Sequence, residues 1–450
     1  MPRVEPSPLS DDELLDRFQH AAFEYFLANA NPANGLVADT SRPNSPASIA
    51  VVGFALSCYP IGVERGWITR QAAAGLTLAA LRFFWESPQG SAKDVTGHKG
   101  FYYHFLDMQS GRRVWRCELS MVDTALLMAG ILLAGAYFSG ESEEETEIRR
   151  LSEALYRRVD WRWAQGGGAT LRQGWKPRSG FLHYGWEGYN EATVLYVLAM
   201  ASPERATTND SYTGWTATYQ WENIYGYDVL YGGPLFMHQF SHAWIDFRGI
   251  RDAFMREKNS DYFENSRRST HLHREYASRN PYGYAGYSEN LWGLSAGDGP
   301  GGRRARIEGR PRGFIGYSAR GAPFGPDDGT ITPWSYPASL PFAPDICLSA
   351  MRHLLARYPE VVEGFRLPSG FNPTLAHRRG FGRNGWISEG YYGLDQGITV
   401  LMIENHRSGL VWDLMRSHPH IRRGLSAAGF GGGWLAAAAA GPAIGGRDAA

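Results

Sequence analysis

The sequence predicts an all-α protein, and the simplest architecture is an (α/α)6 barrel, a ring of helical hairpins whose inner layer is buried by an outer one. Two kinds of segment alternate along the 450 residues, one apolar on nearly every side and one apolar on a single face. Long loops rich in glycine, proline and aromatic residues join them, and strand-like alternation is confined to short stretches near 311–331. A layered helical arrangement buries the apolar surface of both kinds of helix.

The first hairpins are indicated by capping and by the spacing of apolar residues. Ser10 is followed by three acidic residues, which suits a helix start, and apolar positions at helical spacing continue to Phe26. Residues 48–59 are apolar nearly all round and predict a helix buried on both sides, with 69–86 as its amphipathic partner.

The alternation then continues toward the C-terminus. We expect further buried segments and amphipathic partners over residues 118–138, 141–159, 187–200, 234–244, 262–277, 338–358 and 395–404. No linker divides the chain, so residues 10–435 are predicted to form one domain. The Ala- and Gly-rich residues 436–450 are predicted to be a disordered tail.

Composition excludes several classes of protein. The 45 basic and 45 acidic side chains balance, so nothing marks the chain as a binder of nucleic acid or of a membrane surface. Aromatic residues make up 14% of the chain, which suits either a bulky core or stacking on sugar faces. The cysteines lie far apart and predict neither a disulfide framework nor a zinc motif; they are Cys58, Cys117 and Cys347.

The N-terminal segment, MPRVEPSPLSDDELL, is polar and acidic without an apolar core, so no signal peptide is predicted. No segment offers about 18 uninterrupted apolar residues, so no transmembrane span is expected. These features predict a cytoplasmic protein, or a periplasmic or secreted one if the N-terminus has been trimmed.

Four carboxylates stand at the starts of predicted buried helices, where the loops of a helical ring converge at one end. They are Glu118 and Asp123 in CELSMVDTALLMAG, Glu191 in GYNEATVLYVL, and Asp395 in YYGLDQGITVLMIEN. Any one of them could be a helix cap or a first-turn charge. Together, flanked by aromatic residues and glycine, they favour a shared acidic, aromatic-lined cleft. Cleavage of a glycosidic bond needs two carboxyl groups, so the cleft fits a sugar-cleaving site.

Two further carboxylates lie in Gly-rich turns. Asp298 and Asp328 are near Trp292 and Trp334 in the sequence, so turn formation and substrate binding both remain open for them.

Three histidines are candidates for metal ligands. His238 and His242 are spaced as HxxxH, but the Glu of a zinc motif does not follow the first His, so metal binding is not expected. His104 in FYYHFLD is expected to form hydrogen bonds rather than to bind a metal.

A family resemblance is carried by GFYYHFLD, ELSMVDTALLMAG, WEGYNEATVLYVLAMASP, GGPLFMHQFSHAWIDFRGI, DYFENSRRST, DGTITPWSYPASLPFAPDICL and LDQGITVLMIENHRSGLVW. These stretches span roughly residues 10–434. In them the chain resembles the bacterial glycoamylase-like family, which includes glycoside hydrolase family 144, the endo-β-1,2-glucanases, and has a related domain in cyclic β-1,2-glucan synthases.

The resemblance implies an (α/α)6 barrel without metal or organic cofactor. It also implies hydrolysis of β-1,2-glucan, or of a related β-glucan, with inversion and with endo action. Its acidic residues map onto Glu118, Asp123 and Glu191. We expect Glu191 to be the general acid, because aromatic surroundings would raise its pKa, with Asp123 as base or orienter of water and Glu118 in support. The expected substrate-binding residues are His104, Trp186, Glu187, Tyr189, His238, His242, Trp292, Asp298, Asp328, Trp334 and Asp395.

Other functions on the same scaffold stay open. One is a non-catalytic glucan-binding module associated with glucan synthesis, and another is a transglycosylase or phosphorylase. Phosphorolysis would need a basic anion pocket, for which His238, Arg116 and Arg320 are the candidates. The expected partner is an oligo- or polysaccharide, and the oligomeric state is open.

Overall fold

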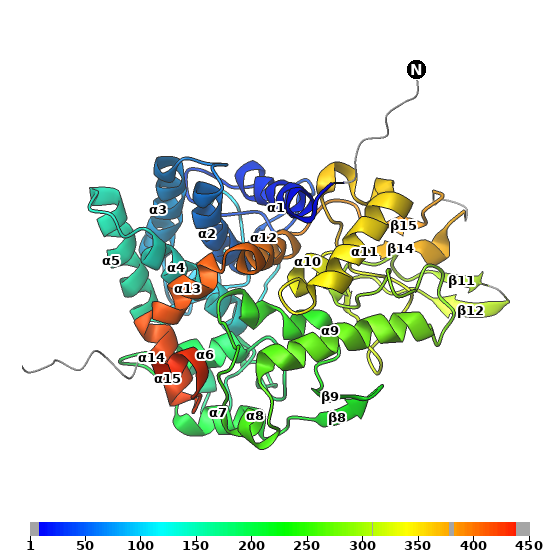
Figure 1. Cartoon of the computed structure of the whole chain (residues 1–450). Coiled ribbons are helices and arrows are strands. Elements are labelled where there is room, and N and C mark those ends of the chain that lie inside the picture. Colours follow the sequence, from blue (N-terminus) through cyan, green and yellow to red (C-terminus); the bar gives the residue numbers. More distant parts are fainter. Residues whose placement is uncertain (1–8, 308, 378–381, 438–450) are drawn as a thin grey trace, which may run out of the picture.

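The computed structural model describes residues 9–307, 309–377 and 382–437, and helices are the dominant element within them (Figure 1). The predicted class is therefore confirmed in its coarse form, a mostly helical chain. The arrangement as an (α/α)6 barrel stays a prediction. Most of the predicted tail, 438–450, lies outside the described residues.

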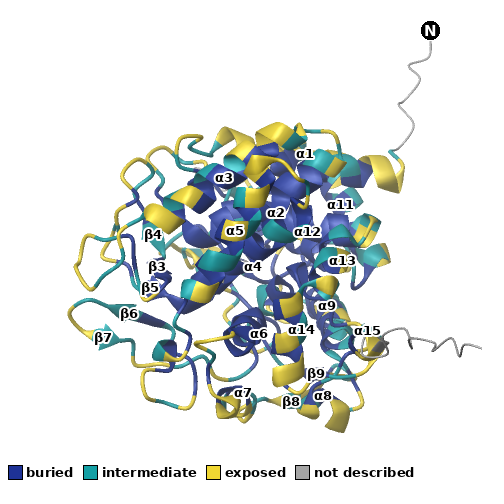
Figure 2. Cartoon of the chain, turned by 90° about the vertical axis from the view of Figure 1, so that its left-hand side faces the viewer, coloured by how far each residue is buried: buried dark blue, intermediate teal, exposed yellow. Residues whose placement is uncertain are grey.

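An inner layer consists of helices that are buried on nearly all sides. They are α2 (Ile49–Glu64), α4 (Met121–Tyr137), α6 (Thr193–Ala201) and α12 (Gly393–Arg407), which are largely dark blue in Figure 2, together with α10 (Ser335–Ser339). Helix α2 packs against α4 and α12, α4 packs also against α6, and α12 packs also against α10. Nearly every side chain of α2 and α4 is apolar and buried, which places both helices in the centre of the core.

Amphipathic helices cover this layer: α1 (Asp11–Ala28), α3 (Arg70–Glu86), α5 (Glu143–Arg158), α9 (Tyr262–Arg279), α11 (Pro344–Arg357), α13 (Leu410–Ser417) and α14 (Pro419–Ala427). Helix α1 packs on α12, α3 on α2, α5 on α4, α11 on α10 and α14 on α6. The predicted start of α1 is confirmed, because the Ser10 hydroxyl accepts the Glu13 backbone N–H and the Glu13 carboxylate accepts the Ser10 backbone N–H.

Shorter helical elements complete the described chain. They are α7 (Asn209–Thr216), α8 (Ala253–Glu257), α15 (Gly433–Ala437), and the 3₁₀ turns η1 (Trp163–Gln165), η4 (Pro359–Val361), η5 (Glu363–Phe365) and η6 (Pro373–Leu375). No helix of the described ranges is long and apolar enough to cross a bilayer.

Helices α2 and α4 approach closely because both carry glycine at the crossing. A Cβ atom added to Gly130 would lie 2.0 Å from the Gly53 carbonyl oxygen, and one added to Gly53 would lie 2.4 Å from the Leu126 carbonyl oxygen. Neither gap admits a side chain, so these two glycines set the spacing of the central helix pair.

Two predicted helices are interrupted. Residues 234–244 are buried as expected, but they form two 3₁₀ turns, η2 (Leu235–His238) and η3 (Phe240–Ala243). Segment 338–358 divides into α10 and α11, because Pro341 has no N–H to continue a helix and Pro344 suits the first turn of a new one.

Most of the short antiparallel strands were not predicted from the sequence. The largest sheet has the order β2–β3–β5–β6–β7 and consists of β2 (Gly97–His98), β3 (Phe101–Tyr103), β5 (Leu119–Ser120), β6 (Gly174–Lys176) and β7 (Gly180–Phe181). Strands of two or three residues carry too little alternation to be recognised. Strand β5 leads directly into α4, and this brings Glu118 beside His104, which follows β3.

The remaining strands form two-stranded antiparallel pairs. They are β1 (Ala47–Ser48) with β4 (Phe105–Leu106), β8 (Trp221–Ile224) with β9 (Tyr227–Leu230), β10 (Ala296–Gly297) with β13 (Ser318–Ala319), β11 (Arg304–Ile307) with β12 (Arg310–Gly313), and β14 (Phe371–Asn372) with β15 (Trp386–Ile387). Strands β12 and β13 coincide with the strand-like stretches expected near 311–331.

Candidate active site

A cavity of about 770 Å³ lies where loops lead into α4, α6 and α12, within the range of volumes typical of ligand sites. Five carboxylates line it, namely Asp39, Glu118, Asp123, Glu191 and Asp395. The wall also holds the aromatic side chains Phe105, Trp115, Trp186, Phe236, Phe240, Tyr317, Trp334 and Tyr392. Of the residues expected from the sequence, the three catalytic candidates and His104, Trp186, Trp334 and Asp395 therefore meet in one place.

Glu191 stands just before α6, whose first residue is Thr193. Ser241 of η3 fixes this position, since its hydroxyl donates to the Glu191 carbonyl oxygen at 2.8 Å and accepts the Val194 N–H at 3.0 Å. The Glu191 Oε2 atom is buried and has no hydrogen-bond partner among the described residues. Burial of the carboxyl, with the charge of Asp123 adding to it, raises the pKa of Glu191 to about 7.

His104 joins two of the other carboxylates. Its Nδ1 lies 2.9 Å from Glu118 Oε1, and its Nε2 lies 3.6 Å from Asp123 Oδ2. Burial lowers the pKa of His104, but the negative charges of Asp123 and Glu118 outweigh burial and raise it to about 9. The hydrogen bond from His104 in turn lowers the pKa of Glu118 to about 2. At neutral pH the group is thus an imidazolium between two carboxylates.

Asp123 occupies the first turn of α4, and its neighbour Ser120 is the N-cap. The Ser120 hydroxyl accepts the Asp123 backbone N–H at 3.3 Å and donates to the Asp123 carboxylate. The cap that begins α4 therefore also orients this carboxylate in the cavity wall.

Asp395 and Asp39 form a second acidic pair in the cavity. Asp395 lies in the first turn of α12, and its Oδ2 atom is buried without a hydrogen-bond partner among the described residues. Burial and the charges of Asp39 and Asp298 raise the pKa of Asp395 well above its usual range. Burial likewise raises the pKa of Asp39 to about 6, against the lowering effect of His104. No sequence pattern indicated Asp39, which lies in the polar loop before α2.

The remaining predicted site residues do not line this cavity. Buried His238 and His242 contact Asn265 and Ser266 of α9, and burial lowers the pKa of both histidines, so they are neutral core residues. Within the described ranges, no cluster of three or more His, Cys, Asp or Glu side chains could hold a metal ion.

Three more predicted residues have other surroundings. Tyr189 is stacked on Tyr262 with ring centroids 5.8 Å apart, and Trp292 packs edge-on against Tyr336. Glu187 is exposed and accepts a hydrogen bond from the Thr170 hydroxyl at 3.1 Å. Tyr189 and Trp292 are core residues, and Glu187 is a surface residue.

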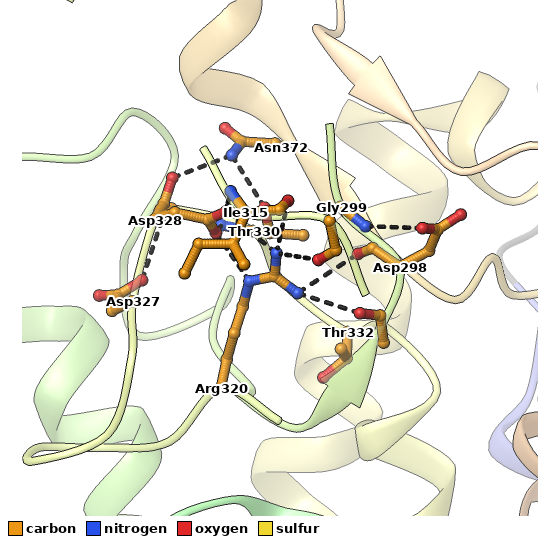
Figure 3. Close-up of polar contacts among 12 residues, drawn as sticks. Asp298, Gly299, Ile315, Arg320, Asp327, Asp328, Thr330, Thr332 and Asn372 are labelled. Carbon is orange, nitrogen blue, oxygen red and sulfur yellow. Dashed lines mark hydrogen bonds and ion pairs between the residues drawn. The ribbon is translucent and has the colours of Figure 1, made fainter. Parts of the chain in front are cut away.

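Asp328 and Asp298 belong to a buried polar cluster beside the cavity (Figure 3). The Asp328 carboxylate is paired with Arg320, and Asp328 does not line the cavity. Asp298 accepts hydrogen bonds from Arg42 and from Ser388. Arg42 itself lines the cavity, so Asp298 is connected to the cavity wall through Arg42.

Residues 183–419, more than half of the chain, match the family model "Glycoamylase: Putative glucoamylase". The chain belongs to this family. The predicted resemblance is thereby confirmed.

Named relatives and solved structures extend the match over most of the chain. An exo β-1,2-glucooligosaccharide sophorohydrolase (non-reducing end) from Parabacteroides distasonis is 27% identical over 454 residues, which cover 93% of this chain and 58% of that protein. The chain therefore spans little more than half the length of that relative.

Two solved structures superpose along their whole length. A putative glucoamylase from Bacteroides uniformis has a TM-score of 0.83 and 30% identity, and the match covers 95% of this chain and 100% of that one. An endo-β-1,2-glucanase from Chitinophaga pinensis, in complex with sophorotriose and glucose, has a TM-score of 0.82 and 25% identity, again covering 95% and 100%.

Proposed function

We propose that this protein is an inverting glycoside hydrolase that cleaves β-1,2-glucan or a related β-glucan. The observation that carries the proposal is Glu191, a carboxyl with a pKa of about 7 and an unpartnered buried oxygen in a cavity that holds further carboxylates. Such a group is protonated in part at neutral pH and has an oxygen free to meet a ligand. The names of the related glucanases support the choice of substrate. We also propose that the two helical layers form the (α/α)6 barrel expected from the sequence.

In this mechanism Glu191 donates its proton to the glycosidic oxygen as the bond from that oxygen to the anomeric carbon breaks. A water molecule attacks the anomeric carbon from the opposite face, and a second carboxylate accepts a proton from that water. The new bond forms on the face opposite to the one that breaks, so the configuration at the anomeric carbon inverts.

Two carboxylates are candidates for the base. Asp123 is the one expected from the sequence, and its Oδ2 atom lies 3.6 Å from His104 Nε2 in the cavity wall. Asp395 is supported by its unpartnered Oδ2, an oxygen that could hold a water molecule. Asp123 in either case assists the acid, because its negative charge raises the pKa of Glu191.

Glu118 acts through His104. Glu118 Oε1 lies 2.9 Å from His104 Nδ1 and orients the imidazole ring. The charges of Glu118 and Asp123 together favour the protonated form of His104. The protonated ring can donate a hydrogen bond to a sugar hydroxyl. The aromatic wall suits the apolar faces of pyranose rings.

Phosphorolysis has less support than hydrolysis. Two of the candidates for an anion pocket do not line the cavity: Arg320 is buried and paired with Asp328, and His238 is buried in the core. Arg42 does line the cavity, but its guanidinium is bound by Asp298.

Incubation with linear β-1,2-glucan tests the proposal, with products followed by chromatography and anomeric configuration by NMR. We expect short oligosaccharides whose new reducing ends are initially α. Endo action predicts a range of lengths, and exo action predicts a single short product. Glu191→Gln should abolish turnover, whereas Glu187→Gln, four residues earlier and outside the cavity, should retain it. Binding of glucan without turnover by the unsubstituted protein would favour a binding module, and turnover that requires phosphate would favour a phosphorylase.

A further inference from the structure

A strained turn precedes Glu118 in the cavity wall. Trp115 and Arg116 are consecutive residues with φ of +53° and +52°, in the left-handed region that non-glycine residues seldom adopt. Such a conformation costs about 1–3 kcal/mol for each residue and persists only where the surroundings impose it.

Arg113 imposes this conformation. Its guanidinium donates to the Cys117 carbonyl oxygen at 2.6 Å and to the Arg116 carbonyl oxygen at 2.7 Å, and it lies over the Tyr103 ring at 4.5 Å. The Arg113 side chain therefore connects both ends of the turn, and its contact with Tyr103 of β3 attaches the turn to the sheet. The flanking residue Val114 is tied to β4, because its N–H donates to the Phe105 carbonyl oxygen.

The turn presents Trp115 at the mouth of the cavity. This side chain is 69% exposed and still lines the cavity wall. Its ring lies 5.1 Å from the Phe105 ring, and Phe105 is stacked on His104 at 3.9 Å. A row of rings thus runs from the exposed Trp115 to the imidazole that contacts Glu118 and Asp123.

We propose that Trp115 is a sugar-binding platform for a glucosyl unit of the glucan chain beyond those at the cleaved bond, and that Arg113 positions it. This inference rests on the proposed function and deepens it. A pyranose ring packs its apolar C–H face on an indole, and an exposed indole next to the carboxylates gives this surface to a chain that extends out of the cavity. Trp115 then favours long substrates over short ones.

The test measures kcat and KM for linear β-1,2-glucooligosaccharides of increasing length. Trp115→Ala should raise KM for long chains about tenfold, the loss of one stacked ring, with kcat unchanged. It should leave KM for the shortest cleaved oligosaccharide unaltered. Trp115→Phe should restore most of the affinity for long chains. Arg113→Lys, which keeps the charge but loses the forked pair of hydrogen bonds, should raise the same KM without changing kcat.

Phe324→Ala is the matched control, because Phe324 is 72% exposed and is not part of the cavity wall. It should change neither parameter. Calorimetric binding of the same oligosaccharides to Glu191→Gln, with and without Trp115→Ala, separates the two proposals. If the unsubstituted protein neither binds nor cleaves glucan, the proposed function itself fails. If it cleaves glucan but Trp115→Ala changes long and short substrates equally, or changes neither, the platform is refuted.

Discussion

Arg320 and Asp328 form a bidentate ion pair in which neither side chain is more than 1% exposed (Figure 3). Arg320 Nε lies 2.7 Å from Asp328 Oδ1, and Nη2 lies 3.0 Å from Oδ2. The guanidinium also donates to the carbonyl oxygens of Gly297 and Ile315, and Asp328 accepts the Ile315 N–H. The pair thus joins the two chain segments that place Ala296 and Tyr317 in the cavity wall.

Removal of one partner should be costly. Asp328→Asn leaves a buried guanidinium without its counter-charge, so we expect the free energy of unfolding to fall by about 3–5 kcal/mol. Urea denaturation followed by circular dichroism measures this change. Arg82→Gln removes a partner from the exposed pair Arg82–Glu147 and should cost less than about 1 kcal/mol. Equal losses for the two variants would contradict the view that burial makes the Arg320 pair important.

The pKa of Glu191 predicts how activity depends on pH. A general acid works in its protonated form, so kcat/KM should fall as pH rises through about 7, the raised pKa of this carboxyl in the free protein. Initial rates on linear β-1,2-glucan between pH 4 and 9 test this. Asp123→Asn removes the negative charge that helps to raise this pKa, so the falling limb of its residual activity should move to lower pH. An unmoved limb would show that another group titrates there.

The same pKa predicts how stability depends on pH. A folded-state pKa raised from 4.5 to about 7 means that the folded protein binds this proton more tightly than the unfolded chain. The stabilising contribution is complete below pH 4.5 and is lost as pH rises through about 7. Glu191→Gln mimics the protonated form, so it should match the unsubstituted protein at pH 4 and exceed it above pH 7, by at most about 3 kcal/mol. Thermal unfolding at the two pH values measures the difference.

The identity of the base can be decided with azide. Azide replaces water as nucleophile and needs no base, so it should restore turnover to a variant that lacks only the base. We expect rescue of either Asp123→Ala or Asp395→Ala, with release of a glycosyl azide of inverted configuration. Glu191→Gln lacks the acid and should not respond. Rescue of both variants, or of neither, would argue against a single carboxylate base.

The sequence predicted the helical class and much of the acidic wall, because both depend on local patterns. Glu118, Asp123, Glu191 and Asp395 each stand at the start of an apolar helix, and helix starts converge in a layered fold. The pattern could not identify Asp39, which comes from an irregular loop and reaches the cavity only through tertiary packing.

Most of the predicted site residues that do not line the cavity have side chains that point away from it. His238 and His242 have the spacing of a shared helical face, but the segment folds as 3₁₀ turns and both rings point into the contact with α9. Asp328 has the sequence context of a turn, and nothing local shows that Arg320, eight residues earlier, will be buried against it. Tertiary contacts decide these roles.

The approach of α2 and α4 gives a last prediction, on the core beneath the site. A Cβ on Gly130 would lie 2.0 Å from the Gly53 carbonyl oxygen, and helix backbone cannot yield as a flexible side chain can. Gly130→Ala should therefore lower the free energy of unfolding by about 3 kcal/mol or more, in spite of the better helix propensity of alanine. Gly75→Ala, also inside a helix but exposed and with open space around its Cβ, should raise it by about 0.5–1 kcal/mol. Urea denaturation of the two variants measures both changes, and a stabilising Gly130→Ala would show that the two helices can move apart.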